Sequence, residues 1–380
     1  MTRFGRYALL GSLYFSQGLP FGFFTLALPV VLRARGVDLQ TLGISSLLLA
    51  PWSFKVGWAP LIDRFGTRRQ WIVPLQLATV VVLLGLATVD PVDEVVGLAV
   101  GMFLLALCAS TQDVATDGLA VALLPEAERG FGNGLQVGAY RLGMIGGGAG
   151  IPLLYSAVGP GAAFVAMAGV LAVATVPIGL AVEPPRVRVA RALVPWTVLA
   201  PLFSPRFLPW GIALALYKSG DALSGTMMKA LLVDQGWTLV EIGTLLGLGG
   251  STFGMAGALL GGALTGRLGR RSALLVFGLA QALPQAGFGR LDPVAMVLLE
   301  HALGGMATAA LFTAMMDRCE RPGLEATDYT VQASLVVLFT GAAGAVSGVV
   351  AERLGYLVHF PVCAMLSVLG ALWAAWAVRR

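Results

Sequence analysis

The stretch Gly57-Trp-Ala-Pro-Leu-Ile-Asp63-Arg64-Phe-Gly66-Thr-Arg68-Arg69 decides the fold of this chain. It ends one apolar segment in an aspartate and three arginines, and the next apolar segment follows within a few residues. Lysine and arginine collect in the short cytoplasmic loops of membrane proteins. The stretch therefore predicts a tight cytoplasmic turn between two helices that cross a membrane.

An arginine-rich turn of the same kind returns in the second half of the chain, as Gly262-Ala-Leu-Thr-Gly266-Arg267-Leu-Gly269-Arg270-Arg271. One constant spacing matches Arg64 to Arg267, Arg68 to Arg271 and Tyr14 to Tyr217. Parallel halves that repeat in the same order are typical of transporters built from two six-helix units. The second turn has no aspartate, so for that turn the positive-inside rule alone remains an alternative explanation.

The composition also indicates a membrane protein. Hydrophobic residues make up 57% of the 380 residues and charged residues only 12%, which is too little charge for the surface of a soluble protein of this size. A spanning helix needs about 20 mostly apolar residues. Such runs are predicted at 7–32, 39–60, 71–89, 95–123, 132–155, 162–182, 208–232, 239–264, 272–289, 294–316, 327–350 and 357–378. We therefore expect an all-α membrane protein with 12 transmembrane helices in two six-helix pseudo-repeats.

The longest polar stretch, 183–207, is rich in proline and arginine and resists a spanning helix. We expect it to be a cytoplasmic linker between an N-terminal bundle, 1–182, and a C-terminal bundle, 208–380. With both termini placed in the cytoplasm, most loop arginines fall on the inner side. The net charge of +5 then reflects orientation in the inner (cytoplasmic) membrane as a multi-pass protein, and does not indicate a nucleic-acid partner.

Few residues offer chemistry beyond ionisation. Cys108, Cys319 and Cys363 lie in or beside apolar runs and predict neither a disulfide framework nor a metal site. His301 and His359 are far apart in the sequence and lack a cysteine or carboxylate cluster. Because no nucleophile, base or metal ligands converge, we expect no enzyme, no metal and no cofactor.

Charges inside apolar runs are costly, so each of them is a functional candidate. Asp113 and Asp117 lie four residues apart and share one face of a predicted helix. We predict that they bind substrate or couple transport to protons together with polar residues of other runs. The full set is Tyr14, Gln17, Lys55, Gln112, Asp113, Asp117, Tyr140, Arg141, Tyr217, Lys218 and Asp221. The alternatives are a static ion-pair network in the N-terminal half, a self-contained Lys218–Asp221 pair, and tyrosines that only fill the core.

Several stretches resemble one known family. Tyr14-Phe-Ser-Gln17-Gly18-Leu-Pro20, the stretch 50–64 and Gln112-Asp113-Val-Ala-Thr-Asp117 are similar to AmpG-type permeases and the related acetyl-CoA transporter branch of the major facilitator superfamily. The turn at 57–69 resembles the loop signature of that superfamily. Siderophore importers of the RhtX/FptX type are similar in the same segments. The family's loop signature forms a latch at the cytoplasmic gate. The resemblance therefore implies gating roles for Asp63, Arg64, Arg68, Arg267 and Arg271.

The resemblance implies alternating access and proton-coupled import of a small solute such as a muropeptide or a siderophore. The cations Lys55, Arg141 and Lys218 inside apolar runs favour an anionic or zwitterionic solute. A multidrug or metabolite efflux antiporter of the same fold is the alternative, although Gly150 and Pro152 match the glycine- and proline-rich signature of such antiporters poorly. A non-transporting sensor is the alternative from another class, and a doubled fold with buried charges argues against it. The expected partners are a small-molecule substrate, protons and the lipid bilayer, and we expect a monomer.

Overall fold

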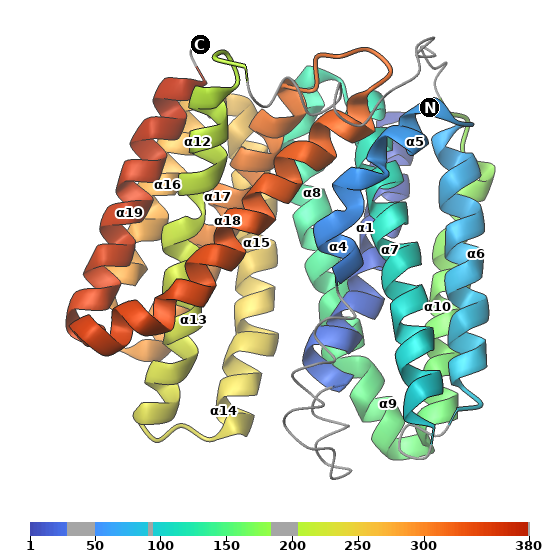
Figure 1. Ribbon diagram of the computed structural model, residues 1–380, viewed down its shortest axis with the longest axis horizontal. Helices are drawn as coiled ribbons and strands as arrows, with labels where there is room; N and C mark the ends of the chain where they lie inside the picture. Colours follow the sequence, from blue (N-terminus) through green and yellow to red (C-terminus); the bar gives the residue numbers. More distant parts are fainter. Residues whose placement is uncertain (29–49, 90–93, 184–203, 379–380) are drawn as a thin grey trace. The chain divides into compact units, whose positions relative to one another are not determined.

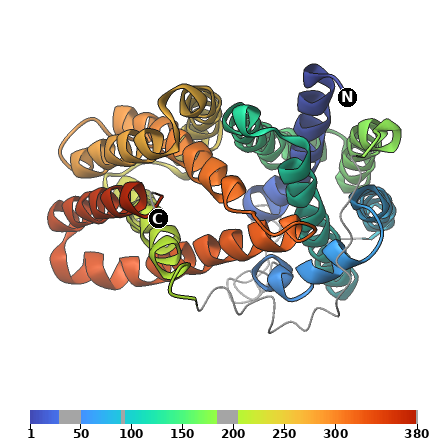
Figure 2. The ribbon, with the colours of Figure 1, turned by 90° about the horizontal axis from the view of Figure 1, so that it is seen from above.

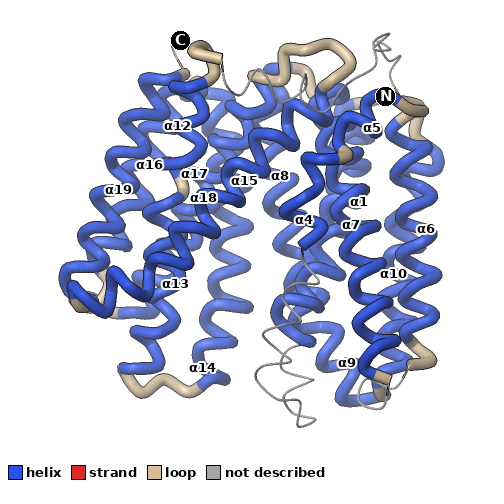
Figure 3. Tube along the Cα trace, in the orientation of Figure 1, coloured by secondary structure: helices blue, strands red, loops and turns tan. Residues whose placement is uncertain are grey.

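The computed structural model describes residues 1–28, 50–89, 94–183 and 204–378, and within these ranges all regular structure is helical (Figure 1, Figure 3). The first half of the sequence forms α1 (Arg3–Gly22), η1 (Phe23–Ala27), α4 (Ala50–Phe54), η3 (Lys55–Gly57), α5 (Ala59–Arg64), α6 (Arg68–Leu86), α7 (Val95–Leu123), α8 (Glu126–Ile145), η4 (Gly146–Gly150), α9 (Ile151–Val158) and α10 (Pro160–Leu180). The second half forms α12 (Leu208–Tyr217), α13 (Ser219–Asp234), α14 (Leu239–Gly243), η6 (Thr244–Gly250), α15 (Ser251–Leu268), α16 (Arg270–Gly287), α17 (Pro293–Asp317), α18 (Glu325–Leu354) and α19 (Tyr356–Ala377). The expected all-α class is confirmed.

In the described part of the chain, 7 helical segments are long and apolar enough to cross a membrane. They are Arg68–Leu86, Val96–Leu123, Pro160–Leu180, Val240–Leu268, Pro293–Asp317, Glu325–Leu354 and Tyr356–Ala377. Residues 29–32 of the expected run 7–32, residues 39–49 of the expected run 39–60 and most of the expected linker 183–207 lie outside the described residues. The count of 12 spans and the cytoplasmic position of the termini stay predictions.

The chain divides into two compact units. Unit 1 comprises Met1–Leu123, Ala139–Ala192 and Glu320–Thr330, and unit 2 comprises Leu124–Gly138, Leu193–Cys319 and Val331–Arg380. The boundary thus falls inside two helices, α8 and α18, and each contributes its N-terminal part to one unit and the remainder to the other. The halves expected from the sequence, 1–182 and 208–380, stay predictions.

In unit 1, α6 packs against α7 and α10, and α1 packs against α10 and the π-helical turn η4. Glycines bring the backbones of α1 and α8 together. A Cβ atom at Gly143 would lie 2.8 Å from the backbone nitrogen of Leu19, and one at Gly22 would lie 2.6 Å from the Cα of Met144. Small residues permit this approach in membrane helices, where packing takes the place of the hydrophobic effect.

Several helices are interrupted at sites where a backbone hydrogen bond is lost. Pro20 lies inside α1 just before the π-helical turn η1, and Pro152 follows the π-helical turn η4. Between α4 and α5 the chain passes through a 3₁₀ turn, Lys55–Gly57, with Pro60 in the first turn of α5. Proline removes a donor and leaves a carbonyl without its helical partner. Such breaks place polar backbone groups at membrane depth.

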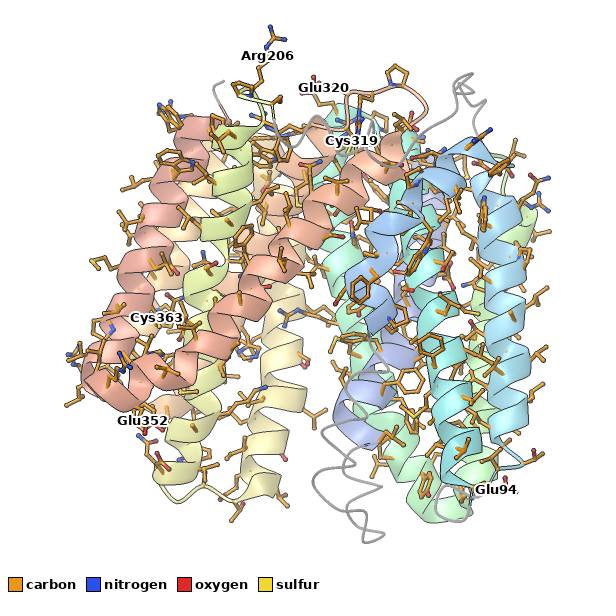
Figure 4. The ribbon with its side chains drawn as sticks, in the orientation of Figure 1. Glu94, Arg206, Cys319, Glu320, Glu352 and Cys363 are labelled. Atoms are coloured by element: carbon orange, nitrogen blue, oxygen red, sulfur yellow. The ribbon has the colours of Figure 1, made fainter. Side chains whose placement is uncertain are left out.

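In unit 2, α17 packs against α15 and α16, and α19 packs against α16, α12 and α13. The views in Figure 1 and Figure 2 both place α19 beside α12. Figure 4 shows Arg206 and Cys319 at one end of these helices and Glu352 at the other. The contact of α15 with α17 is tight, since a Cβ atom at Gly257 would lie 2.7 Å from the carbonyl carbon of Ala302.

Gly257→Ala should therefore destabilise the protein by about 1–3 kcal/mol, because the added methyl group meets backbone that cannot move alone. Gly266→Ala is the matched control on the same helix, since a Cβ atom there meets nothing within 4 Å. It should be neutral or stabilising by up to about 1 kcal/mol. Thermal unfolding in one detergent compares the two variants, and equal stabilities would show that this contact is not tightly packed.

Candidate functional site

A buried ion pair lies in the middle of unit 1. Lys55 starts the 3₁₀ turn between α4 and α5, and its ammonium group pairs with the carboxylate of Asp113 on α7. Only 5% of the lysine surface is exposed. Among the candidate cations of the sequence, it is Lys55 that forms the ion pair with Asp113. Arg141 is half-buried on α8.

A second carboxylate, Asp117, lies one turn further along α7 on the same face. It is buried, and its Oδ1 accepts a hydrogen bond of 2.9 Å from the hydroxyl of Tyr14 on α1. Next to this contact, Ser16 Oγ accepts hydrogen bonds from the amides of Gln76, at 2.8 Å, and Gln112, at 3.5 Å. Tyr14, Lys55, Gln112, Asp113 and Asp117 thus gather in one polar region of unit 1, and their roles in binding or coupling stay predictions.

Two further candidates border this region. Gln17 is 4% exposed, and neither the nitrogen nor the oxygen of its amide bonds to another described residue. The ring of Tyr140 contacts Phe21, at 5.7 Å between centroids, and Phe21 also contacts Trp52 at 5.4 Å. A buried amide without partners costs free energy, so Gln17 is a group that a bound solute can satisfy.

The remaining candidates belong to unit 2. Lys218 lies at the break between α12 and α13, and its Nζ is 2.6 Å from Asp221 Oδ2 and 3.2 Å from Gln281 Oε1. Tyr217 donates to the carbonyl of Leu274 at 3.0 Å and is fully buried, which agrees with a packed core residue. The matching tyrosines of the two halves therefore differ, because Tyr14 bonds to a carboxylate and Tyr217 to backbone.

Two residues near Lys218 and Asp221 were not among the predicted site residues: Glu300 and His301 on α17. Glu300 is 7% exposed, and its Oε2 lies 2.8 Å from Nδ1 of His301. Its carboxyl group is also within hydrogen-bonding distance of that of Asp221. A glutamate inside the run 294–316 is a charge at membrane depth, and that signal was sufficient to select it.

Asp63 is buried in unit 1 and caps the N-terminus of α18. Its Oδ2 accepts hydrogen bonds of 2.7 Å from both the backbone nitrogen and the hydroxyl of Thr327, and its Oδ1 lies 3.4 Å from the backbone nitrogen of Ala326. The first amides of a helix lack internal partners and favour a negative charge. Asp63 therefore holds the start of a helix from the second half of the sequence.

Arg68 completes this contact. Its guanidinium group is 2.7 Å from Glu325 Oε2 and 3.4 Å from Asp63 Oδ1, and only 2% of the residue is exposed. A Cβ atom at Gly118 of α7 would lie 2.8 Å from Arg68 Nε, so the glycine leaves room for the arginine. Arg64, by contrast, is exposed and stacks on the ring of Phe65.

The corresponding turn of unit 2 uses a residue that the sequence analysis did not select. Arg270 Nε is 2.6 Å from Asp317 Oδ2, and Arg129 of α8 pairs with Oδ1 of the same aspartate at 2.8 Å. Arg270 also donates to the carbonyl of Glu126 at 2.8 Å. The predicted gating residues Arg267 and Arg271 are exposed, and within the described ranges the ion pairs of this turn belong to Arg270.

Comparison with known proteins identifies the family. A family model described as Major Facilitator Superfamily matches residues 10–327. The chain belongs to the major facilitator superfamily. Among curated proteins, it is 31% identical over 370 residues to the anhydromuropeptide permease of Escherichia coli (strain K12), covering 92% of this chain and 75% of the permease. The predicted relation to AmpG-type permeases is thereby confirmed, and these homologues are transporters and not enzymes.

Solved structures support the same fold at low sequence identity. The outward conformation of the transporter FucP superposes with a TM-score of 0.79 and 15% identity, over 98% of this chain and 97% of FucP. The human organic anion transporter MFSD10 superposes with a TM-score of 0.79 and 16% identity, over 98% of this chain and 100% of MFSD10. The chain is thus a multi-pass membrane transporter that takes a small-molecule substrate.

The cap at α18 leads to a measurable expectation. Asp63→Ala removes the acceptor of the Thr327 amide and should cost about 0.5–2 kcal/mol of local stability. Hydrogen exchange at Ala326 and Thr327 should then accelerate, by roughly 5- to 30-fold for 1–2 kcal/mol. Asp63→Asn keeps an acceptor and should accelerate it less. Arg64→Ala is the control, and unchanged exchange in Asp63→Ala would show that the carboxylate does not hold the helix.

Proposed function

We propose that this chain is a secondary transporter of the inner (cytoplasmic) membrane that works by alternating access and imports a small anionic or zwitterionic solute with protons. The observation that carries the proposal is the buried Lys55–Asp113 pair beside Asp117 and Tyr14. A charge at membrane depth is costly and requires compensation. If the Asp113 carboxylate binds a proton and loses its charge, the charge of Lys55 must be compensated by another anionic group. Protonation of Asp113 is then coupled to the binding of that group.

The coupling follows from the pair itself. Removing one partner of a buried ion pair leaves an uncompensated charge and costs about 3–5 kcal/mol. When Asp113 binds a proton, Lys55 loses its counterion, and an anionic group of the solute can take that place. When Asp113 releases the proton, the pair forms again and the solute is displaced. Proton and solute therefore bind together and leave together.

The class of solute is supported by two observations. Lys55 and the half-buried Arg141 are the cations of unit 1 that the sequence places inside apolar runs, and both favour an anionic group. A relative at 31% identity is named an anhydromuropeptide permease. The peptide part of a muropeptide carries carboxylates, and the sugar part offers hydroxyl and amide groups suited to Gln17. We therefore propose a muropeptide as the first solute to test.

Thermal unfolding of the purified protein can test this choice, because a ligand stabilises the folded state according to its concentration over its dissociation constant. We expect anhydromuropeptide to stabilise the protein and cationic drugs to leave it unchanged. Ferric siderophores test the other anionic class. Stabilisation by cationic drugs alone would contradict import of an anionic solute and favour an efflux antiporter.

Asp113→Asn should strongly lower uphill accumulation driven by a proton gradient, since the amide cannot exchange a proton. It should preserve exchange of solute across the membrane, because Lys55 remains available to the anionic group. Vesicles with an imposed pH difference separate the two modes. Glu94→Gln, at an exposed position shown in Figure 4, is the control and should transport normally. Full uphill uptake by Asp113→Asn would assign this carboxylate to the scaffold.

A further inference from the structure

Unit 2 contains a second group of buried charges, centred on Glu300. The carboxyl groups of Glu300 on α17 and Asp221 on α13 are within hydrogen-bonding distance of each other. Two ionised carboxylates repel at this distance, and neither can donate a hydrogen bond. The contact is favourable only when one of the two carries a proton.

The two carboxylate oxygens of Asp221 differ in their partners, and this difference indicates which of them can accept a hydrogen bond from a protonated Glu300. Oδ2 pairs with Lys218 Nζ at 2.6 Å. Oδ1 is buried and accepts from no donor in the described part of the chain. It faces α17, since a Cβ atom at Gly304, one turn after Glu300, would lie 3.4 Å from it. A protonated Glu300 supplies the donor that this buried oxygen otherwise lacks.

The charges around the pair balance with one such proton. Lys218 contributes one positive charge, and Asp221 and Glu300 contribute two negative charges when both are ionised. Nδ1 of His301 lies 2.8 Å from Glu300 Oε2 and 2.9 Å from the carbonyl oxygen of Val297, contacts that a hydrogen on Nδ1 satisfies in either the neutral or the protonated imidazole. With His301 neutral, a proton on Glu300 makes the group neutral overall, as an apolar surrounding favours.

The neighbouring elements add no further charge among the contacts of the described residues. α16 contributes the amide of Gln281, which bonds to Lys218 and to the carbonyl of Tyr217. The imidazole of His359 on α19 lies within hydrogen-bonding distance of Cys363 and Ser347 instead. The described residues also contain no group of three or more His, Cys, Asp or Glu that could hold a metal ion.

We propose that Glu300 and Asp221 share one proton and form a second proton-binding site of this transporter, in addition to Asp113. The proton resides on the Glu300 carboxyl group and is donated to Asp221 Oδ1. Release of the proton leaves Glu300 ionised, with His301 as its partner. The existence of the site does not depend on the proposed function, whereas its role in transport rests on it.

The direct test is infrared spectroscopy of the whole protein in lipid vesicles, in which the C=O stretch of a protonated carboxylic acid separates from that of a carboxylate. The wild type should show this band at neutral pH and lose it as the pH rises. Glu300→Gln should lose the band, while its amide still donates to Asp221. Asp221→Asn should lose it too, because an ionised Glu300 then pairs with His301 without a repelling neighbour.

The controls separate this site from other carboxyl groups. Glu352→Gln removes an exposed glutamate of unit 2 and should keep the band (Figure 4). Asp113→Asn and Asp117→Asn change unit 1 and should keep the component that Glu300→Gln removes. Persistence of that component in Glu300→Gln would overturn the proposal. If that component disappears in Glu300→Gln but persists in Asp221→Asn, Glu300 is protonated because of its burial alone. That result would overturn the proposal that Glu300 and Asp221 share the proton.

A transport measurement distinguishes the site from the proposed function. The number of protons moved per anhydromuropeptide, from the accumulation ratio at a set pH difference, should fall by one in Glu300→Gln and stay unchanged in Glu352→Gln. An unchanged number in Glu300→Gln would overturn the role of the site in transport. A band that depends on Glu300 and Asp221, found together with no proton-driven uptake of any tested solute, would support the proton site and contradict the proposed function.

Discussion

The compensation of buried charge is the constraint on which the rest of this structure depends. Both lysines of the candidate sites lie at interruptions of their helices: Lys55 begins a 3₁₀ turn, and Lys218 separates α12 from α13. At a break, backbone carbonyls lose their helical donors and can accept from other groups. The cation, its carboxylate partner and the freed backbone therefore occur together. Each unit thereby has a lysine–carboxylate pair at a helix break.

The same constraint acts at the helix ends through backbone amides and carbonyls. Asp63 accepts a hydrogen bond from the backbone amide of Thr327 at the start of α18. Arg68 forms ion pairs with both Asp63 and Glu325. In the other unit, Asp317 is the last residue of α17 and pairs with Arg129 and Arg270, and Arg270 also donates to the carbonyl of Glu126. In unit 1 the acid is Asp63, which binds the start of α18. In unit 2 it is Asp317 at the end of α17, which two arginines share. Both fasten a helix by charge where glycines leave room for close contact.

The sequence predicted what depends on composition and on spacing along one helix. The all-α class follows from the apolar runs, and the common face of Asp113 and Asp117 follows from their separation of four residues. The family followed from the resemblance of motifs such as Gln112-Asp113-Val-Ala-Thr-Asp117. The pairing of Asp113 with Lys55 could not be predicted, because it depends on the break at the 3₁₀ turn. Arg270 was not selected because one constant spacing between the two halves matches Arg68 to Arg271. The loop at 65–67 is longer than the single residue before α16, so Arg68 and Arg270, not Arg271, are the first residues of their helices.

The buried carboxylates lie on corresponding helices of the expected repeat, but the lysines do not. The buried carboxylates Asp113 and Glu300 lie on α7 and α17, which are the fourth and the tenth of the expected spans and therefore corresponding helices. The lysines do not correspond, because Lys55 belongs to the second expected span and Lys218 to the seventh. Lys55 can thus pair only across helices, and its partner is lost when Asp113 is protonated. Lys218 keeps Asp221 from its own helix, so Glu300 can bind a proton without leaving a cation uncompensated. This difference in lysine position agrees with the two proposals, in which unit 1 binds the anionic solute and unit 2 holds a proton.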